Sequence, residues 1–177
     1  DPAYKNMPWY NATVPVDVTI SAGATTIGKY MFLGSKNLSS VDLPSGITTI
    51  GEGAFMSCSS ISGMDLPAGI TTIGNLAFRQ CMGLSSMEMP STLTSIGQNA
   101  FSYCTALTRV TIPAGVTLES YAFLSCSALK EVTIGDDVVI GVRAFSLCEV
   151  LTDLSVPVDV QMGDDAFYGC PVVAVTI

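Results

Sequence analysis

The side chains in this sequence that could do chemistry are its thiols and its carboxylates, because histidine is absent. The 177 residues include six Cys, 15 Asp and Glu, and no His. Without His, neither a Ser-His-Asp nor a Cys-His arrangement can activate a nucleophile. Cys-x-x-Cys pairs are also missing, so a zinc site of the usual kind is not expected. We therefore predict that the protein is not an enzyme and carries no cofactor.

The carboxylates are candidates for binding rather than catalysis. Asp42, Asp65 and Glu88 recur at the same place in three successive repeats, and a neighbouring column contains Arg109 and Glu131. These positions are expected to face outward on adjacent strands, where like charges oppose each other at a cost of roughly 0.2–1 kcal/mol per pair. The pattern predicts a site for a basic partner, or for Ca²⁺, which prefers carboxylate oxygens. A solvated acidic face, with Arg109 paired to Glu88 or Glu131, is the alternative.

The thiols recur with a Phe, three residues after it. The Phe residues are Phe55, Phe78, Phe101, Phe123, Phe145 and Phe167, and the Cys residues are Cys58, Cys81, Cys104, Cys126, Cys148 and Cys170. Successive Phe residues are 22 or 23 residues apart, a period typical of a solenoid whose coils bury their apolar faces against each other. Equivalent Cys residues would then stack about 4.8 Å apart with parallel side chains, which permits a disulfide but does not favour it. We predict a stacked Phe core and buried free thiols rather than three disulfides.

Each repeat also contains the elements that would position these side chains. An apolar-polar-apolar triplet such as Val110-Thr111-Ile112 predicts a strand with one buried face. Pro113 follows and ends the strand, because Pro cannot donate to a ladder. A second apolar pair, such as Val116 and Leu118, closes the coil. The Ala-Phe-x-x-Cys stretch is predicted to form one helical turn on the opposite wall. The chain contains eight such triplets, and we predict that they form one parallel sheet.

This pattern resembles the leucine-rich repeats, with the Leu-x-x-Leu-x-Leu motif present as Leu107, Val110 and Ile112. More narrowly it is similar to the BspA-like subfamily of cell-surface proteins, whose motif is nearly complete in residues 84–104. The resemblance covers residues 18–177. It implies a leucine-rich-repeat solenoid of about seven coils of 22–23 residues, with a parallel β-sheet on one wall and short helical turns and loops on the other.

The first 17 residues do not repeat and are predicted to form an N-terminal cap, with Trp9 and Tyr10 over the first coil. An aromatic ligand cage is the alternative interpretation of these two side chains. Asn11 and Asn37 begin N-glycosylation sequons, and the sequence does not decide whether they are used.

The resemblance implies a bacterial surface or secreted protein, located outside the cell, that adheres to an extracellular protein or glycan partner without catalysis. A structural spacer with no ligand of its own is the alternative. A third idea is an ice-binding face, because Thr25-Thr26, Thr48-Thr49 and Thr71-Thr72 would stack as a ladder. The net charge of −8 argues against a nucleic-acid partner, and no apolar run approaches the length of a membrane-spanning helix.

Overall fold

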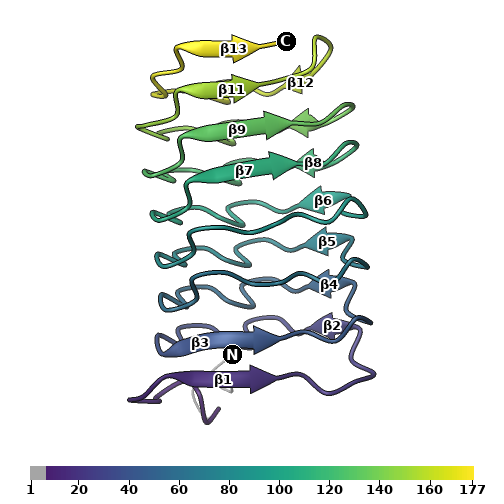
Figure 1. The fold of residues 1–177 in the computed structure, drawn as a ribbon, viewed down its shortest axis with the longest axis vertical. Helices are drawn as coiled ribbons and strands as arrows, with labels where there is room; N and C mark the ends of the chain where they lie inside the picture. The colour runs from purple at the N-terminus through teal and green to yellow at the C-terminus, as the bar shows by residue number, and fades with distance from the viewer. Residues whose placement is uncertain (1–6) are drawn as a thin grey trace.

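Each repeat makes one turn of a solenoid with three walls in the computed structural model, which describes residues 7–177. We call these the triplet wall, the short-strand wall, which holds the second apolar pairs, and the turn wall, which holds the Ala-Phe-x-x-Cys stretches. The coils stack along one axis, with the described N-terminal residues at one end and the C-terminus at the other (Figure 1). This arrangement confirms the predicted solenoid of about seven coils.

The triplet wall has two parallel sheets instead of the single sheet that we predicted. Two strands form the first sheet and four form the second. The strands of this wall are β1 (Val16–Thr19) and β3 (Leu38–Asp42), then β7 (Arg109–Ile112), β9 (Glu131–Ile134), β11 (Asp153–Ser155) and β13 (Ala174–Thr176). In Figure 1 no strand lies on this wall between β3 and β7.

The interruption falls on the two coils whose triplets contain Asp65 and Glu88. The two coils share a hydrogen bond just before their triplets, where the Ser85 N–H donates to the Ser62 carbonyl at 2.9 Å. No strand pairing follows it. Gly63 disfavours a strand because it has no side chain to pack. Stacked carboxylates also repel each other across neighbouring strands. Both effects oppose regular pairing at this point of the wall.

The short-strand wall carries one continuous seven-stranded parallel sheet. Its strands are β2 (Thr26–Ile27), β4 (Thr49–Ile50), β5 (Thr72–Ile73), β6 (Ser95–Ile96), β8 (Thr117–Leu118), β10 (Val139–Ile140) and β12 (Gln161–Met162). From β2 to β10 the second residue of each strand is buried in the core. The first residues face outward, and the hydroxyl ladder that they form ends at Val139.

The turn wall contains no helix within residues 7–177, so the predicted helical turn is wrong. The residues two before and two after each Phe have positive φ, as at Leu76 (61°) and Gln80 (61°) around Phe78. Left-handed residues at this spacing break the helical hydrogen-bond ladder. Instead, the N–H groups of Leu76, Phe78 and Gln80 donate to carbonyls of the next coil at 2.7–2.9 Å. The turn wall is thus a third ladder between coils.

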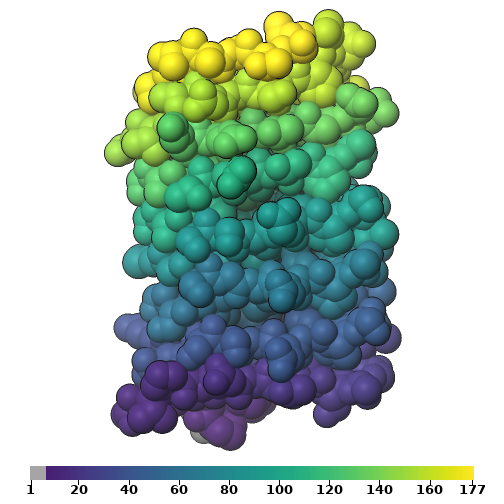
Figure 2. Space-filling model, viewed as in Figure 1, coloured from purple at the N-terminus to yellow at the C-terminus, as the bar shows by residue number. Residues whose placement is uncertain are grey.

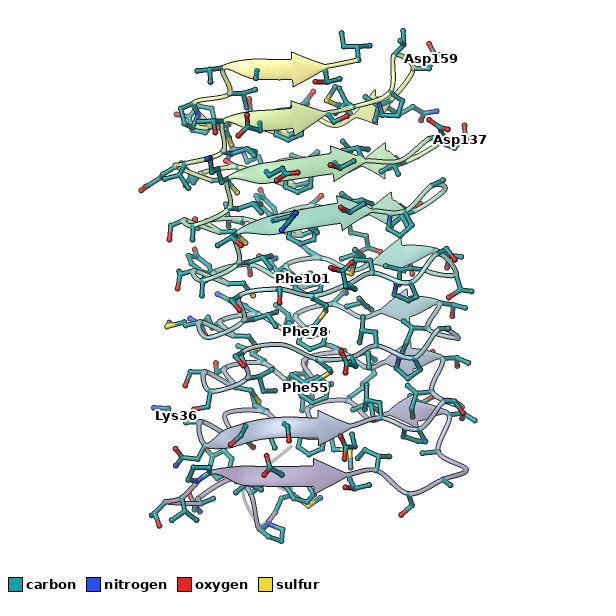
Figure 3. All side chains as sticks on the ribbon, in the orientation of Figure 1. Lys36, Phe55, Phe78, Phe101, Asp137 and Asp159 are labelled. Carbon is teal, nitrogen blue, oxygen red and sulfur yellow. The ribbon has the colours of Figure 1, made fainter. Side chains whose placement is uncertain are left out.

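The core is a column of Phe rings running along the solenoid axis (Figure 3). Neighbouring ring centroids from Phe32 to Phe167 lie 5.0–5.2 Å apart, with interplanar angles of 1–9°. Trp9 extends the column at the N-terminal end, where its ring lies 5.1 Å from that of Phe32. Its indole N–H donates to the Met31 carbonyl at 3.2 Å. Trp9 therefore covers the first coil, and these contacts favour the cap over the aromatic cage.

Ser35 takes the place of Cys in the first coil and leaves a defect there. Its hydroxyl is buried and has no hydrogen-bond partner among the described residues. The Cys thiols of later coils donate to a Phe carbonyl in the preceding coil, as Cys58 does to Phe32. Ser35 has no such coil before it. An unpartnered buried hydroxyl costs about 1–3 kcal/mol.

We expect Ser35→Ala to raise the free energy of unfolding by about 1 kcal/mol, because it removes the unpartnered hydroxyl. The matched control is Ser102, which is equally buried but donates to the Asn99 carbonyl at 3.1 Å. Ser102→Ala should lower stability by about 0.5–1.5 kcal/mol. Urea titrations of the two variants measure both values, and a loss of stability in Ser35→Ala would show that its hydroxyl is satisfied.

Candidate binding face

The candidate site is the interruption of the triplet wall, which we call the acidic gap. It is a hollow of about 470 Å³ lined by Asp42, Asp65 and Glu88 together with the small residues Ser40, Gly63 and Ser86, and with apolar residues of the same coils. All three carboxylates are exposed. Figure 2 shows the wall that carries the gap in space-filling form, with the coils stacked from purple to yellow.

The elements around the gap position each carboxylate differently. Asp42 is the last residue of β3, and Thr19 of β1 donates its hydroxyl to the Asp42 carboxylate at 3.4 Å. Asp65 and Glu88 lie on the two segments without strand pairing. The buried residues Met64 and Met87 anchor these segments in the core, so the side chains that follow point outward.

Arg109, the basic residue beside the gap, has no ion-pair partner among the described residues. Arg109 opens β7 and lies opposite Glu131 in the strand register, but it forms no ion pair within residues 7–177. Neither of the pairings that we considered, with Glu88 or with Glu131, is therefore made. A second hollow of about 290 Å³, which shares Ser86, Met87 and Glu88 with the first, extends the site to Arg109. The acidic gap and Arg109 thus form one continuous face.

Sequence reasoning missed one acidic residue of this face. Asp17 of β1 lies opposite Ser40 in the register and accepts a hydrogen bond of 2.6 Å from the Ser40 hydroxyl. Ser40, Gly63, Ser86 and Arg109 occupy the same outward position in successive coils, and extending this column back by one coil leads to Asp17. Asp17 adds a fourth carboxylate next to Asp42 and lengthens the acidic surface toward the N-terminal end.

A metal site is not favoured by the geometry. Among the residues that the structure describes, no group of three or more His, Cys, Asp or Glu side chains could hold a metal ion. Asp42, Asp65 and Glu88 share a face, but they do not converge on one point as Ca²⁺ ligands must.

The thiols serve the core instead of a site. Five of the six Cys are buried, Cys170 is half-buried, and all are free. Each thiol donates to the carbonyl of a Phe in the preceding coil, with sulfur to oxygen distances of 2.9–3.4 Å. Burial raises the pKa of the Cys58 thiol to about 12 and the pKa of Cys81 and Cys104 well above the ordinary value. Such thiols are poor nucleophiles, because the thiolate is the reactive form.

We expect a thiol reagent at pH 8 to leave the buried Cys of the native protein unmodified, and to modify all six Cys after denaturation. A free thiol titrates near 8.5 when unfolded, and the folded pKa of Cys58 is about 12. The contribution of the Cys58 thiol to stability is therefore fully present below about pH 8.5 and is lost as the pH rises through about 12. Mass spectrometry reads the modification, and a denatured protein that takes up no reagent would show that disulfides are present.

The two sequons differ in accessibility. Asn11 is exposed. Asn37 is half-buried, and its amide donates to the Ala12 carbonyl at 2.5 Å. Its backbone carbonyl also accepts a hydrogen bond from the Val16 N–H at 2.8 Å. Asn37 thus ties the cap to the first coil, which favours a structural role over glycosylation.

Another hollow, of about 550 Å³, lies elsewhere, along β8, β10 and β12. Glu119 is its one charged residue, and the Glu119 carboxylate accepts a hydrogen bond from the Gln98 N–H at 3.1 Å. Exposed Val139, Val142 and Met162 supply much of the remaining lining. This hollow contains none of the predicted site residues.

Residues 7–177 include no helix with the length and apolar character that crossing a membrane requires. Among curated proteins, none matches the chain. Solved structures do match it. A leucine-rich repeat protein from Bacteroides ovatus is 27% identical with a TM-score of 0.80, over 89% of this chain and 50% of that one. A leucine-rich repeat protein from T. pallidum is 30% identical with a TM-score of 0.80, over 88% of this chain and 77% of that chain.

A third match, a leucine-rich repeat protein from Eubacterium ventriosum, is 28% identical with a TM-score of 0.82, over 89% of this chain and 44% of that chain. This chain therefore spans about half or less of two of these proteins. The BspA-type leucine-rich-repeat region is matched in six copies, over residues 9–118 and 48–174. With its repeats, its solenoid and these matches, the chain belongs to the BspA-type leucine-rich-repeat family.

Proposed function

We propose that this protein is a non-enzymatic binding module of a bacterial surface or secreted protein, and that the acidic gap binds a basic segment of an extracellular protein partner. The observation that carries the proposal is the gap itself. It places Asp42, Asp65 and Glu88 around one hollow of about 470 Å³.

The cost of this arrangement supports a binding role. Like charges on neighbouring strands are destabilising, and the outward positions of later coils hold Thr111 and Thr133 in place of carboxylates. The same wall could therefore form a regular sheet with Thr, as it does at β7 and β9. A ligand that neutralises the carboxylates would recover the lost stability when it binds.

A spacer without a ligand is the rival function, and a glycan is the rival ligand. A spacer needs only the stacked coils, and it gives no role to an interrupted wall with three carboxylates. A neutral glycan gains little from a row of carboxylates, whereas Lys or Arg side chains complement them directly. The acidic surface thus favours the basic protein partner over both rivals.

We expect the protein to bind basic extracellular-matrix proteins on an array, and the triple variant Asp42→Thr, Asp65→Thr, Glu88→Thr to bind them at least about tenfold more weakly, because charge complementarity is lost. The matched control is Asp136→Ser, Asp159→Ser, Asp164→Ser, which removes the same charge from exposed residues outside the gap. It should bind like the parent. If both triple variants bind equally weakly, net charge and not the acidic gap determines binding. If neither the parent nor the variants bind, the result favours the spacer.

The single variant Asp65→Thr should unfold at a higher temperature than the parent, because it relieves repulsion worth roughly 0.2–1 kcal/mol per pair. Thermal melts with and without Ca²⁺ test this expectation and the metal alternative together. A bound ion would raise the melting temperature of the parent only. If Asp65→Thr lowers the melting temperature, the carboxylates stabilise the fold, which contradicts a binding role inferred from their repulsion.

A further inference from the structure

Arg79 is a cation on the turn wall whose side chain has no polar partner within residues 7–177. Its Nε atom is buried there without a hydrogen bond, and its guanidinium belongs to neither of the ion pairs in this part of the chain. An aromatic ring holds the group instead, because its Cζ atom lies 5.8 Å from the centre of the Tyr103 ring. Contact at this distance is a cation–π interaction. The guanidinium is thus held in place, while its hydrogen-bonding capacity is not used.

Arg143 shows how a second Arg of the turn wall is satisfied by the protein itself. It also lies over a Tyr of the next coil, with 5.9 Å between its Cζ atom and the centre of the Tyr168 ring. Its Nε and Nη2 atoms donate to the Asp165 carboxylate at 3.1 and 2.9 Å. Among the described residues no carboxylate does the same for Arg79. An anion that pairs with Arg79 therefore has to come from a partner.

Carboxylates are absent from the surface around Arg79 in four successive coils. The stretches that lead from the turn wall to the triplets in these coils are residues 53–62, 76–85, 99–108 and 121–130. They contain no Asp or Glu, and their charged residues are Arg79 and Lys130. Figure 3 shows Lys36 at the edge where such stretches enter the triplet wall, and Asp137 and Asp159 at the opposite edge. In a chain with a net charge of −8, this is the edge that repels an anionic group least.

Apolar side chains are exposed on the same wall. Tyr103 is 36% exposed, and Met82, which follows Cys81, is 51% exposed. Met56 and Leu124 occupy the position of Arg79 in other coils and are half-buried. Further coils lie on both sides of each of these residues, so their exposure belongs to the wall itself.

This composition fits a protein partner better than a polysaccharide. Tyr, Met and Arg are the residue types enriched in protein–protein interfaces, and Met adapts its shape to apolar side chains. A polysaccharide has few apolar groups to place against Met82, and Arg79 already covers one face of the Tyr103 ring. The complementary ligand is a peptide segment with a carboxylate beside apolar residues.

We propose that the turn wall around Arg79 is a second binding surface, which takes an Asp or Glu side chain of a protein partner together with the apolar residues next to it. The partner's carboxylate accepts hydrogen bonds from the guanidinium, whose planar group matches it. The apolar residues cover Met82 and Tyr103. This surface lies on a different wall from the acidic gap and selects the opposite charge, so the proposal does not rest on the function proposed above.

The test selects peptides from a displayed library of random linear sequences on the full chain. We expect one class of selected peptides to carry Asp or Glu beside apolar residues. Synthetic peptides of this class should bind Arg79→Gln at least about tenfold more weakly than the parent, because charge-assisted hydrogen bonds are lost. Tyr103→Ala should weaken them too, since it removes the support of the guanidinium. Fluorescence anisotropy measures both, and basic peptides selected at the acidic gap should bind the two variants unchanged.

The matched control is Arg143→Gln, which removes an equal charge from the same wall but from an Arg that Asp165 already pairs. It should bind the acidic peptides as the parent does. Thermal melts check that the variants fold. If Arg79→Gln does not, Arg79→Lys takes its place, because it keeps the charge and loses the planar group; it should also weaken binding.

Three results would overturn the proposal. The first is a selection without acidic peptides. The second is equal weakening in Arg143→Gln, which would make net charge the cause. The third is that heparin binds the parent through Arg79 while the acidic peptides do not, because the ligand would then be an anionic polysaccharide.

Discussion

Replacing Phe101 by Ala should lower the free energy of unfolding by about 3–5 kcal/mol, as for other Phe side chains removed from a core. Phe101 is fully buried. Its ring stacks on Phe78 at 5.2 Å and on Phe123 at 5.0 Å. No neighbouring side chain can fill the space without leaving its own place in the column, so the cavity persists. Chemical denaturation of the variant and the parent measures the difference.

Phe167→Ala is the matched control, because it removes the same side chain at the end of the column. Phe167 is half-buried and, among residues 7–177, stacks on one ring only, that of Phe145, at 5.1 Å. Its loss should lower stability by less than half as much as that of Phe101. The stability of a solenoid is close to a sum of neighbour terms, so equal costs at both positions would contradict a linear stack. A smaller cost at Phe101 would contradict it as well.

The period and the composition of the columns could be predicted from the sequence because each coil repeats one burial pattern. The stacked Phe residues, the inward apolar residues and the outward Asp42, Asp65 and Glu88 all follow from spacing alone. A shift of register by one residue would turn every buried side chain outward, so the repeats allow one register only. The repeats thus define the faces of the coil before any contact is known.

The interruption of the triplet wall could not be predicted from the same pattern. Met64-Asp65-Leu66 and Met87-Glu88-Met89 alternate as regularly as Val110-Thr111-Ile112 does, so periodicity alone predicts a strand in all three. The difference lies in the neighbours, because pairing depends on cross-strand contacts. The acidic residues were found by sequence, but the hollow between them was not.

The conformation of the turn wall could not be predicted for a different reason. Positive φ is usual for Gly and is tolerated by Asn, as at Gly53 and Asn99. In other coils, however, the same position holds Leu76 or Tyr121, with φ of 61° and 63°, which sequence rules for left-handed residues do not anticipate. Hydrogen bonds to the next coil offset this strain, and those bonds exist only once the coils are stacked.

A column of Gly residues sets how closely the coils approach at the end of the short strands. Its members are Gly28, Gly51, Gly74, Gly97, Gly141 and Gly163, with Glu119 in the remaining coil. A side chain at Gly141 would place its Cβ 2.7 Å from backbone atoms of Leu118, Glu119 and Ser120. Distances below 3.0 Å to backbone cannot be relieved by turning a side chain, so the two coils would have to move apart.

Gly141→Ala should therefore lower the free energy of unfolding by about 1–3 kcal/mol, the usual cost of overpacking. Gly28→Ala is the matched control, because the first coil has no coil before it and the space around its Cβ is open to 4 Å. Gly28 has no positive φ either, so Ala should leave stability unchanged or raise it by about 0.4–1 kcal/mol through the unfolded chain. Urea titrations compare the two variants.

Equal stability of the two variants would mean that the coils move apart to accommodate a side chain in this column. They do so at Glu119, whose carboxylate accepts a hydrogen bond from the Gln98 N–H. A large loss in Gly141→Ala alone would show that close approach of backbones holds the inner coils in register.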